Sequence, residues 1–314
     1  MRKLFILLLV AVLLAPAAVS ASTVVTSFYP VWLLTLNLTA GIDGITVRNL
    51  AAPDTGCLHD YTLMPSDMLA LSGAEALLIN GAGMESFLPM VLEACPGLPV
   101  IDASEGIELL EEDEDEDHDH EENDHEEHDH EGHSHEGHSH GEEGNSHIWL
   151  DPLRASEMAE NLAEGLIRMM PEHAGAIRAN LADLQARLTA LAALMKSSVQ
   201  DLSGRDVIIM HKAFPYFAEA CGLNVIETVD KEPEDNLPAS RLAELIRTVS
   251  ASPVLPVVIR STEEDPAVSV LAEETGVPVC ALDTLASGPD NPPLDYYEIT
   301  MLNNLRLISD ALSE

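Results

Sequence analysis

The sequence predicts an α/β protein with two lobes, each built on a mostly parallel sheet flanked by helices, that are joined by one long rigid linker helix. Short runs of β-branched and aliphatic residues alternate with helical stretches in both halves of the chain, which is the pattern of parallel sheets. An acidic segment, residues 111–144, separates the halves. A long apolar stripe after this segment predicts the connecting helix.

The N-terminal half is expected to contain four strands with helices between them. The strand candidates are residues 23–27, 45–50, 76–79 and 98–101. The helical candidates are an amphipathic stretch at 30–40, and residues 65–72, 84–92 and 155–170. Ordered sequence resumes after the acidic segment at residues 147–152.

The long helix begins near Pro171, a residue that suits a first helical turn. From Glu172 to Leu202 it would measure roughly 45 Å at about 1.5 Å per residue, a length better suited to joining two lobes than to lying within one. Its apolar stripe, at alternating spacings of four and three residues, consists of Ile177, Leu181, Leu184, Leu188, Leu191 and Met195.

The C-terminal half repeats the alternation. Its strand candidates are residues 206–210, 224–228, 254–259 and 278–282, and its helical candidates are 214–221, 239–250, 266–275 and 296–312. The expected organisation is a signal peptide (1–21), an N-terminal lobe (22–170) that contains the acidic segment, a linker helix (171–202) and a C-terminal lobe (203–314).

The N-terminus has the layout of a secretory signal peptide. Arg2 and Lys3 precede an apolar stretch, residues 4–14, and residues 18–21 (AVSA) fit a cleavage site between small residues. The apolar stretch is too short to span a bilayer comfortably, and no cysteine stands directly after the cleavage site to carry a lipid. We therefore expect cleavage after Ala21 and a periplasmic mature protein.

The segment 111–144 carries 18 Asp or Glu, no Lys or Arg and no apolar side chain. Such a segment cannot bury apolar surface, so a solvated, mobile loop is expected. Imidazoles and carboxylates are also ligands of divalent metal ions, and repeated His-x-His units favour an accessory metal-binding role over a plain charge run. Its nine histidines are His118, His120, His125, His128, His130, His133, His135, His138 and His140.

The overall charge excludes one class of partner. The net charge is −39, and only 4% of the residues are aromatic. A body this acidic repels nucleic acid and has few side chains for base stacking. No nucleic-acid partner is expected, whereas cationic partners are favoured.

Export permits disulfides among the four cysteines. Two cysteines lie before the acidic segment and two after it, so the pairs Cys57–Cys95 and Cys221–Cys280 would each stay within one half. This is one of three possible connectivities, and buried free thiols are an equal alternative.

Four residues outside the acidic segment are candidate metal ligands: His59, His147, His211 and Asp283. His211 and Asp283 directly follow predicted strands and His59 lies in the loop after another, which is where ligands bind in open α/β sheets. His147 begins the ordered segment after the acidic one. Three imidazoles and one carboxylate suit a near-tetrahedral Zn²⁺ site, with Mn²⁺ or Fe²⁺ as alternatives.

The motifs around these residues resemble the periplasmic metal-binding subunits of zinc and manganese ABC importers, above all the zinc-uptake members. The similar stretches are VVTSFYP (24–30), LHDYTLMPSDMLALSGAEALLINGAGMESFL (58–88), HIWLDP (147–152), MHKAFPYFAEACGL (210–223) and ALDTL (281–285). They occur in order and cover almost the whole mature chain. A histidine- and acid-rich insertion just before the second histidine is itself a feature of the zinc-selective branch.

The resemblance implies that His59, His147, His211 and Asp283 hold Zn²⁺ as a transported ligand, and that two lobes bridged by a rigid helix close only modestly. It also implies a monomer without enzymatic activity, which delivers the ion to a membrane permease powered by an ATPase. Manganese members tend to have Glu in the third position, so His211 favours zinc.

The chain departs from the family pattern at several positions. Leu58 stands where the family usually has Pro, and Cys57 lies unexpectedly close to a candidate ligand. VIRSTEE (258–264) replaces a late Phe-x-Glu motif, and His173 matches no motif and is expected at the surface.

Two other functions are compatible with parts of this pattern. A zinc hydrolase needs an open coordination position and a general base, but the sequence has neither HExxH nor G-x-S-x-G, and a fourth protein ligand would close that position. A periplasmic zinc buffer or chaperone would use the acidic segment as its main functional element, with the folded lobes as a support.

Overall fold

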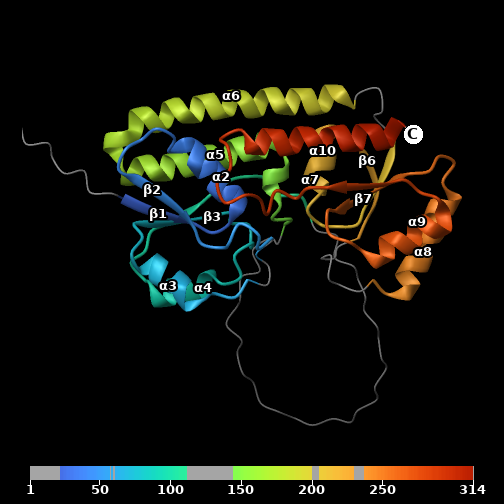
Figure 1. Ribbon diagram of the computed structural model, residues 1–314, viewed down its shortest axis with the longest axis horizontal. Helices are drawn as coiled ribbons and strands as arrows, with labels where there is room; N and C mark the ends of the chain where they lie inside the picture. The colour runs from blue at the N-terminus through green and yellow to red at the C-terminus, as the bar shows by residue number, and fades with distance from the viewer. Residues whose placement is uncertain are drawn as a thin grey trace, which may run out of the picture.

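The computed structural model describes residues 22–56, 58, 61–111, 144–199, 205–229 and 237–313. The expected signal peptide, Cys57, His59 and nearly all of the acidic segment lie outside these ranges. The described residues form two α/β lobes side by side along the long axis of the molecule (Figure 1), and each lobe contains a four-stranded parallel sheet. The predicted fold class is confirmed.

The sheet of the N-terminal lobe has the strand order β2-β1-β3-β4. Its strands are β1 (Ser22–Thr26), β2 (Ile45–Asn49), β3 (Ala76–Ile79) and β4 (Val100–Asp102). Its helices are α2 (Tyr29–Leu38), α3 (Pro65–Ser72), α4 (Leu88–Ala94) and α5 (Pro152–Met169), and the 3₁₀ turn η1 (Ile148–Leu150) precedes α5. β3 is buried at every position, as a parallel strand covered on both faces should be.

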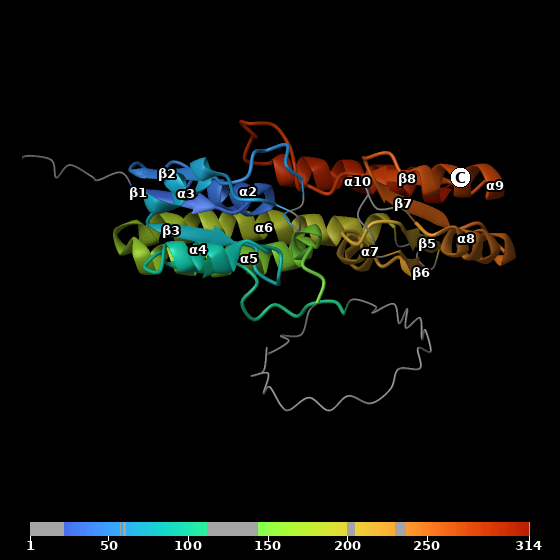
Figure 2. The same ribbon diagram turned by 90° about the horizontal axis from the view of Figure 1, so that it is seen from below.

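The C-terminal lobe repeats this topology with the order β6-β5-β7-β8. Its strands are β5 (Asp206–Ile209), β6 (Asn224–Thr228), β7 (Val257–Ser261) and β8 (Val279–Leu282). Its helices are α7 (Pro215–Cys221), α8 (Ala239–Ala251), α9 (Pro266–Thr275) and α10 (Tyr296–Ser313). In Figure 2, seen from below, the two lobes lie end to end.

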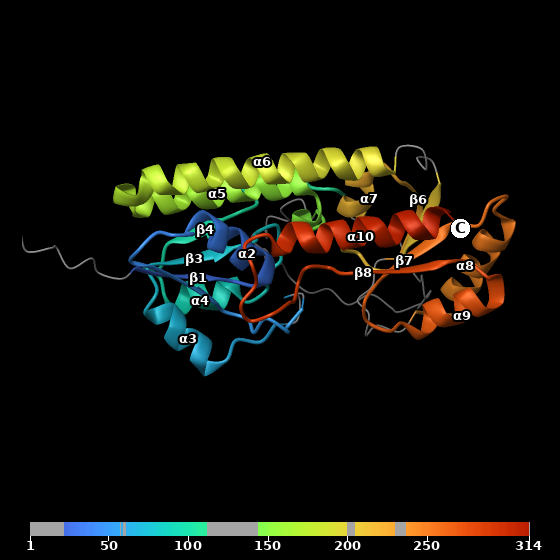
Figure 3. The same ribbon diagram turned by 45° about the horizontal axis from the view of Figure 1, so that its top comes forward.

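Helices cover both faces of each sheet (Figure 3). The side chains of β5 and of Met210, the residue after it, show how the two helical layers divide the core. Successive residues of a strand point to opposite faces of the sheet. Val207 and Ile209 belong to a core that runs continuously through both lobes. Ile208 and Met210 belong to a second core, which is completed by side chains of α8 and α9.

The long helix α6 (Ala174–Ser198) follows the 3₁₀ turn η2 (Pro171–His173) and extends over both lobes (Figure 1). It packs against α2 and α5 in one lobe and against α7 and α10 in the other. Its 25 residues give a length of about 37 Å. The predicted stripe is buried except for Leu181, which is partly exposed.

The prediction of an amphipathic helix after β1 was wrong. In α2 only Trp32 and Leu36 are not buried. The helix lies between the sheet and the pair α5 and α6, so both of its sides meet protein. A helix that is apolar all round is the pattern of such a buried element.

A second connection fastens the lobes together. The segment between β8 and α10, residues 283–295, reaches back to the N-terminal lobe (Figure 1). Gly288 N donates to Pro53 O at 2.9 Å, and the Tyr29 hydroxyl donates to Pro289 O at 3.0 Å. Only glycine fits at position 288, because a Cβ there would lie 2.4 Å from the Tyr29 hydroxyl oxygen.

The predicted disulfides are not formed. Cys95, Cys221 and Cys280 are free thiols in the structure, and Cys57 lies outside the described residues. Cys221 ends α7 whereas Cys280 lies in the edge strand β8, so each fills a separate place in the core. Within the described ranges, no helix has the length and apolar character needed to cross a membrane.

Candidate metal centre

The candidate ligands occupy the ends of elements that the fold brings toward the junction of the lobes. His211 lies just after β5, and Asp283 directly follows β8. His147 directly precedes η1. His59 is not among the described residues, but the preceding Leu58 is fully buried in the core.

His147 and His211 come together across the two lobes. Their ring centroids are 6.0 Å apart and their planes lie at 82°. His147 is completely buried and His211 is 3% exposed. Two imidazole nitrogens at about 2.0–2.1 Å from one tetrahedral Zn²⁺ ion place the ring centroids roughly 5 Å apart. The histidine pair could therefore share one ion if its rings approached by about 1 Å.

The Asn145 side chain fixes the ring of His147. Its Oδ1 lies 3.1 Å from Nδ1 of His147 and also accepts from the His147 backbone N–H at 2.9 Å. Its Nδ2 donates to Lys212 O at 2.6 Å. Because an amide oxygen can only accept, Nδ1 of neutral His147 carries the proton and Nε2 keeps the lone pair that binds metals.

The ring of His211 has the opposite hydrogen-bond pattern. Its Nδ1 accepts from the Ala213 backbone N–H at 3.0 Å. In the neutral ring the proton then lies on Nε2. If His211 binds a metal through Nε2, the proton must move or leave and the contact with Ala213 must be given up. Phe214 flanks this ring, with centroids 5.9 Å apart.

Asp283 is held by its own hydrogen bonds. Its backbone N–H donates to Oδ1 of Asn304 at 2.9 Å, and its carbonyl accepts from Nδ2 of the same residue at 2.8 Å. Burial raises the pKa of Asp283 above its ordinary value, and the Leu285 N–H, which donates to Oδ1 at 2.8 Å, acts in the opposite direction. This carboxylate is therefore half-buried and already accepts one backbone donor.

The structure brings together two of the four candidates. In the part of the chain that it describes, no group of three or more His, Cys, Asp or Glu is close enough to hold a metal ion. The four-ligand set therefore stays a prediction. His173 lies in the turn before α6, partly exposed.

The nine histidines of the acidic segment lie outside the described residues, but the residues at its two ends are described. Glu111 and Gly144 form an antiparallel bridge, and Asn145 N donates to Leu110 O at 2.8 Å. The segment therefore leaves and re-enters the fold at one place, three residues before His147.

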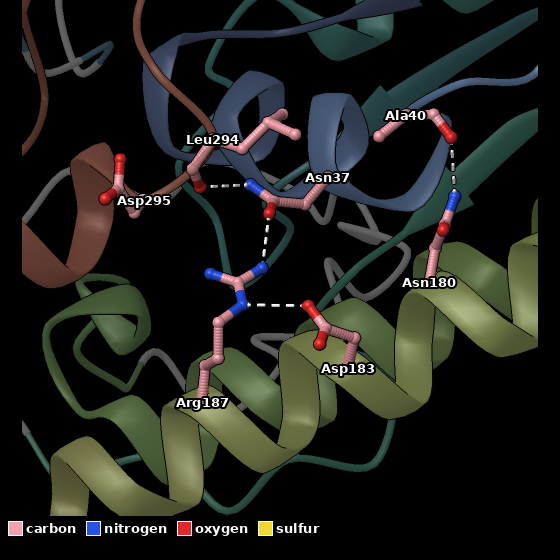
Figure 4. Close-up of a pocket in the computed structure, with 7 residues that line it drawn as sticks. All are labelled: Asn37, Ala40, Asn180, Asp183, Arg187, Leu294 and Asp295. Carbon is pink, nitrogen blue, oxygen red and sulfur yellow. Dashed lines mark hydrogen bonds and ion pairs between the residues drawn. The ribbon is translucent and has the colours of Figure 1, made fainter.

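A cavity in the part of the chain that the structure describes is separate from the histidine pair. It measures about 330 Å³ and lies between α2, α6 and the segment before α10 (Figure 4). Figure 4 shows Arg187 reaching from α6 to Asn37, whose side-chain amide in turn donates to Leu294 O. None of the candidate ligands lines this cavity. The complete lining is Asn37, Ala40, Asn180, Asp183, Arg187, Leu294 and Asp295.

Reasoning from the sequence missed the residues that support the histidine pair. Asn145, Trp149 and Tyr216 all contact residues far away in the chain, and their roles depend on those partners. The ring of Trp149 lies next to that of His147, with centroids 5.0 Å apart. The Tyr297 hydroxyl donates to the carbonyl of Trp149 at 2.6 Å. The only local signal was the position of Asn145 and Trp149 two residues to either side of His147.

The sequence matches, over residues 24–311, the family described as zinc-uptake complex component A, periplasmic (ZnuA). The high-affinity zinc uptake system protein ZnuA of Yersinia pestis is 30% identical over 288 residues, which cover 88% of this chain and 88% of that protein. The zinc-binding protein AdcA of Streptococcus pyogenes is 28% identical over 299 residues. That match covers 92% of this chain but only 56% of AdcA.

A solved structure gives the same result for the fold. A zinc-bound deletion mutant of ZnuA superposes with a TM-score of 0.70 at 25% identity, covering 93% of this chain and 98% of that one. The family consists of solute-binding components of transporters and not of enzymes, as the sequence predicted. With the match extending over nearly its whole length, this chain belongs to the zinc-uptake complex component A (ZnuA) family.

Proposed function

We propose that this protein captures Zn²⁺ in the periplasm and delivers it to an ABC-type permease powered by a cytoplasmic ATPase. The observation that carries the proposal is the buried His147–His211 pair, with one histidine from each side of the junction and ring centroids 6.0 Å apart. Membership of the zinc-uptake family, whose description is periplasmic, supports the same function.

The proposed ligands are His59, His147, His211 and Asp283. Three neutral imidazoles and one carboxylate would fill all four positions of a near-tetrahedral site. A site without an open coordination position suits reversible binding of an ion that is carried and not used in catalysis. Imidazole in place of a third-position carboxylate favours zinc over manganese. Ligation needs neutral rings, so the affinity is expected to weaken as the pH falls through about 6.5.

The acidic segment is proposed as an accessory to this site. It would concentrate cations near the histidine pair, hold additional zinc weakly or report metal status. Its 18 carboxylates attract divalent ions mainly at low ionic strength, because screening shortens their field to about 10 Å at 0.1 M salt. The bridge between Glu111 and Gly144 fixes its two ends beside His147, which supports an accessory role.

Export by a cleavable signal peptide, residues 1–21, and action as a monomer complete the proposal. The lipid-anchored alternative is represented among the relatives, since AdcA of Streptococcus pneumoniae is described as a zinc-binding lipoprotein. The residue directly after the expected cleavage site is Ser22 and not a cysteine, which supports a mature protein without a lipid anchor.

The experiment is zinc calorimetry on the metal-free mature chain and on a variant in which an Asn-Gly turn replaces residues 112–143. The antiparallel bridge of Glu111 with Gly144 makes a two-residue turn a suitable connection. One tight site should survive this replacement and disappear in His147→Ala and His211→Ala. His173→Ala, which removes a histidine outside the site, is the matched control.

Two outcomes would contradict the proposal. If the loop replacement removed the tight site, the protein would act mainly as a zinc buffer through its acidic segment. If His147→Ala and His211→Ala bound zinc as tightly as His173→Ala, the metal would lie elsewhere. Competition with Mn²⁺ and Fe²⁺ in the loop-replaced chain tests the choice of metal.

A further inference from the structure

We propose that Asn145 is a positioning residue that presents Nε2 of His147 to the metal and aligns that histidine with His211 across the lobes. This inference rests on the proposed function and extends it to a residue that binds no metal itself. Asn145 is 4% exposed, and every polar group of its backbone and side chain has a partner.

The side-chain amide of Asn145 has only one possible orientation. Its nitrogen must face Lys212 O, 2.6 Å away, because a carbonyl can only accept a hydrogen bond. Its oxygen must then face Nδ1 of His147 at 3.1 Å. Nδ1 is held as the protonated nitrogen, and Nε2 is left as the metal-binding one. A partner of this kind selects the tautomer and orients the ring of a ligand histidine.

The same amide connects the two candidate ligands. Lys212 directly follows His211, so the bond from Nδ2 of Asn145 holds the backbone of one ligand next to the side chain of the other. Along the backbone, residues 145 and 212 are 67 positions apart, so this hydrogen bond is a far more direct link between them than the chain itself. Asn145 therefore fixes the spacing of the histidine pair as well as the tautomer of His147.

Tyr216 of α7 holds the backbone of Asn145 in place. Its hydroxyl donates to Asn145 O at 2.6 Å and accepts from Leu110 N at 2.9 Å. The guanidinium of Arg154 lies 4.7 Å from the centre of the Tyr216 ring. One hydroxyl thus joins the residues before and after the acidic segment to the C-terminal lobe.

The test uses the full mature chain and three substitutions. Asn145→Ala removes the acceptor and should weaken zinc binding about 10- to 100-fold, the usual effect of losing a partner of a ligand histidine. Asn145→Asp keeps an acceptor for Nδ1 but loses the donor to Lys212 O, so it should weaken zinc binding less than Asn145→Ala does. Affinity is measured by competition with a chromophoric chelator.

Asn161→Ala is the matched control. Asn161 likewise donates to backbone carbonyls through Nδ2, here to both Ala103 O at 2.8 Å and Glu105 O at 2.9 Å, but it contacts neither histidine. Its loss should leave zinc affinity unchanged. If Asn145→Ala bound zinc as tightly as Asn161→Ala, or if Asn145→Asp lost as much affinity as Asn145→Ala, the inference would be wrong.

A second measurement needs no metal. Nitrogen-15 NMR of the histidine rings should find His147 protonated at Nδ1 in the parent chain and in Asn145→Asp, and a tautomer mixture in Asn145→Ala. His147→Gln identifies the signal. A parent ring protonated at Nε2 would overturn the inference. Should His147→Ala keep the tight site, the proposed ligand set fails instead, while the NMR result still decides the role of Asn145.

Discussion

The indole nitrogen of Trp149 donates a hydrogen bond of 2.8 Å to the carbonyl of Thr284. Trp149 stands two residues after His147 and Thr284 directly follows Asp283, so this bond ties together the chain segments of two candidate ligands from opposite lobes. Phe28 adds an edge contact to the same indole, with ring centroids 5.1 Å apart. The environment of the histidine pair is therefore built by contacts between lobes.

Trp149→Phe should lower both stability and zinc affinity. It leaves the partly buried carbonyl of Thr284 without its donor and creates a cavity where a fully buried indole packed, at a cost of about 2–4 kcal/mol. Urea unfolding and chelator competition measure the two effects. Trp32→Phe is the control, because the buried Nε1 of Trp32 has no partner among the described residues. Equal losses in the two variants would contradict this role of Trp149.

Glu85 should make stability depend on pH. Burial raises the pKa of this carboxyl to about 7, although the N–H groups of Asn80 and Gly81 donate to it. The folded state therefore binds the proton more tightly than the unfolded chain does. The stabilisation is complete below about pH 4.5 and is lost as the pH rises to about 7, a change on the order of 3 kcal/mol.

Urea unfolding at pH 5 and pH 8 in the presence of a chelator tests this dependence. Glu85→Gln should flatten the profile between these values, although an amide leaves one of the two backbone donors without an acceptor. Glu93→Gln changes an exposed carboxylate of α4 and should keep the parent profile. A Glu85→Gln profile as steep as that of the parent would show that another group causes the dependence.

Arg187 should stabilise the junction of the lobes. From α6 it pairs with Glu298 of α10 and with Asp183, and it donates to Oδ1 of Asn37 in α2 at 2.5 Å (Figure 4). Arg187→Met should cost about 1–3 kcal/mol, because it leaves the largely buried Glu298 carboxylate unpaired. Arg187→Lys should not restore the loss, since an ammonium cannot reproduce the planar fork.

Arg306 provides the matched control for Arg187. It forms an exposed pair with Asp310 one turn along α10, at 3.1 Å. Arg306→Met should change stability by less than about 0.5 kcal/mol, as exposed helical pairs usually do. Urea unfolding compares the variants, and similar values for Arg187→Met and Arg306→Met would exclude a junction role.

The buried cysteines should behave as inert thiols. Burial raises the pKa of Cys221 to about 12 and that of Cys280 to about 11. Neither should react with a thiol reagent at pH 8 until urea unfolds the chain, and a reductant should not alter the unfolding midpoint. A midpoint that falls on reduction would mean that a disulfide forms after all. Partly exposed Cys95 serves as the internal comparison.

Local patterns were sufficient to predict most of the elements. The strand at residues 76–79 and the helices at 65–72 and 266–275 have the predicted bounds. A short apolar run defines the strand, and each helix begins with a proline and is followed by a glycine. The apolar stripe likewise predicted α6. The helix α2 shows the limit of this reasoning, since burial on all sides comes from neighbours that its own periodicity does not reveal.

The sequence by itself determined the family, the two-lobed fold and the histidines that the structure pairs, because ligand type and the short motifs around His147 and His211 are local properties. Only the tertiary structure decided how those histidines are held. The contacts of Asn145 with Lys212 and of Trp149 with Thr284 join residues 67 and 135 positions apart. Such contacts arise when two lobes pack together, and no periodicity of a single segment specifies them.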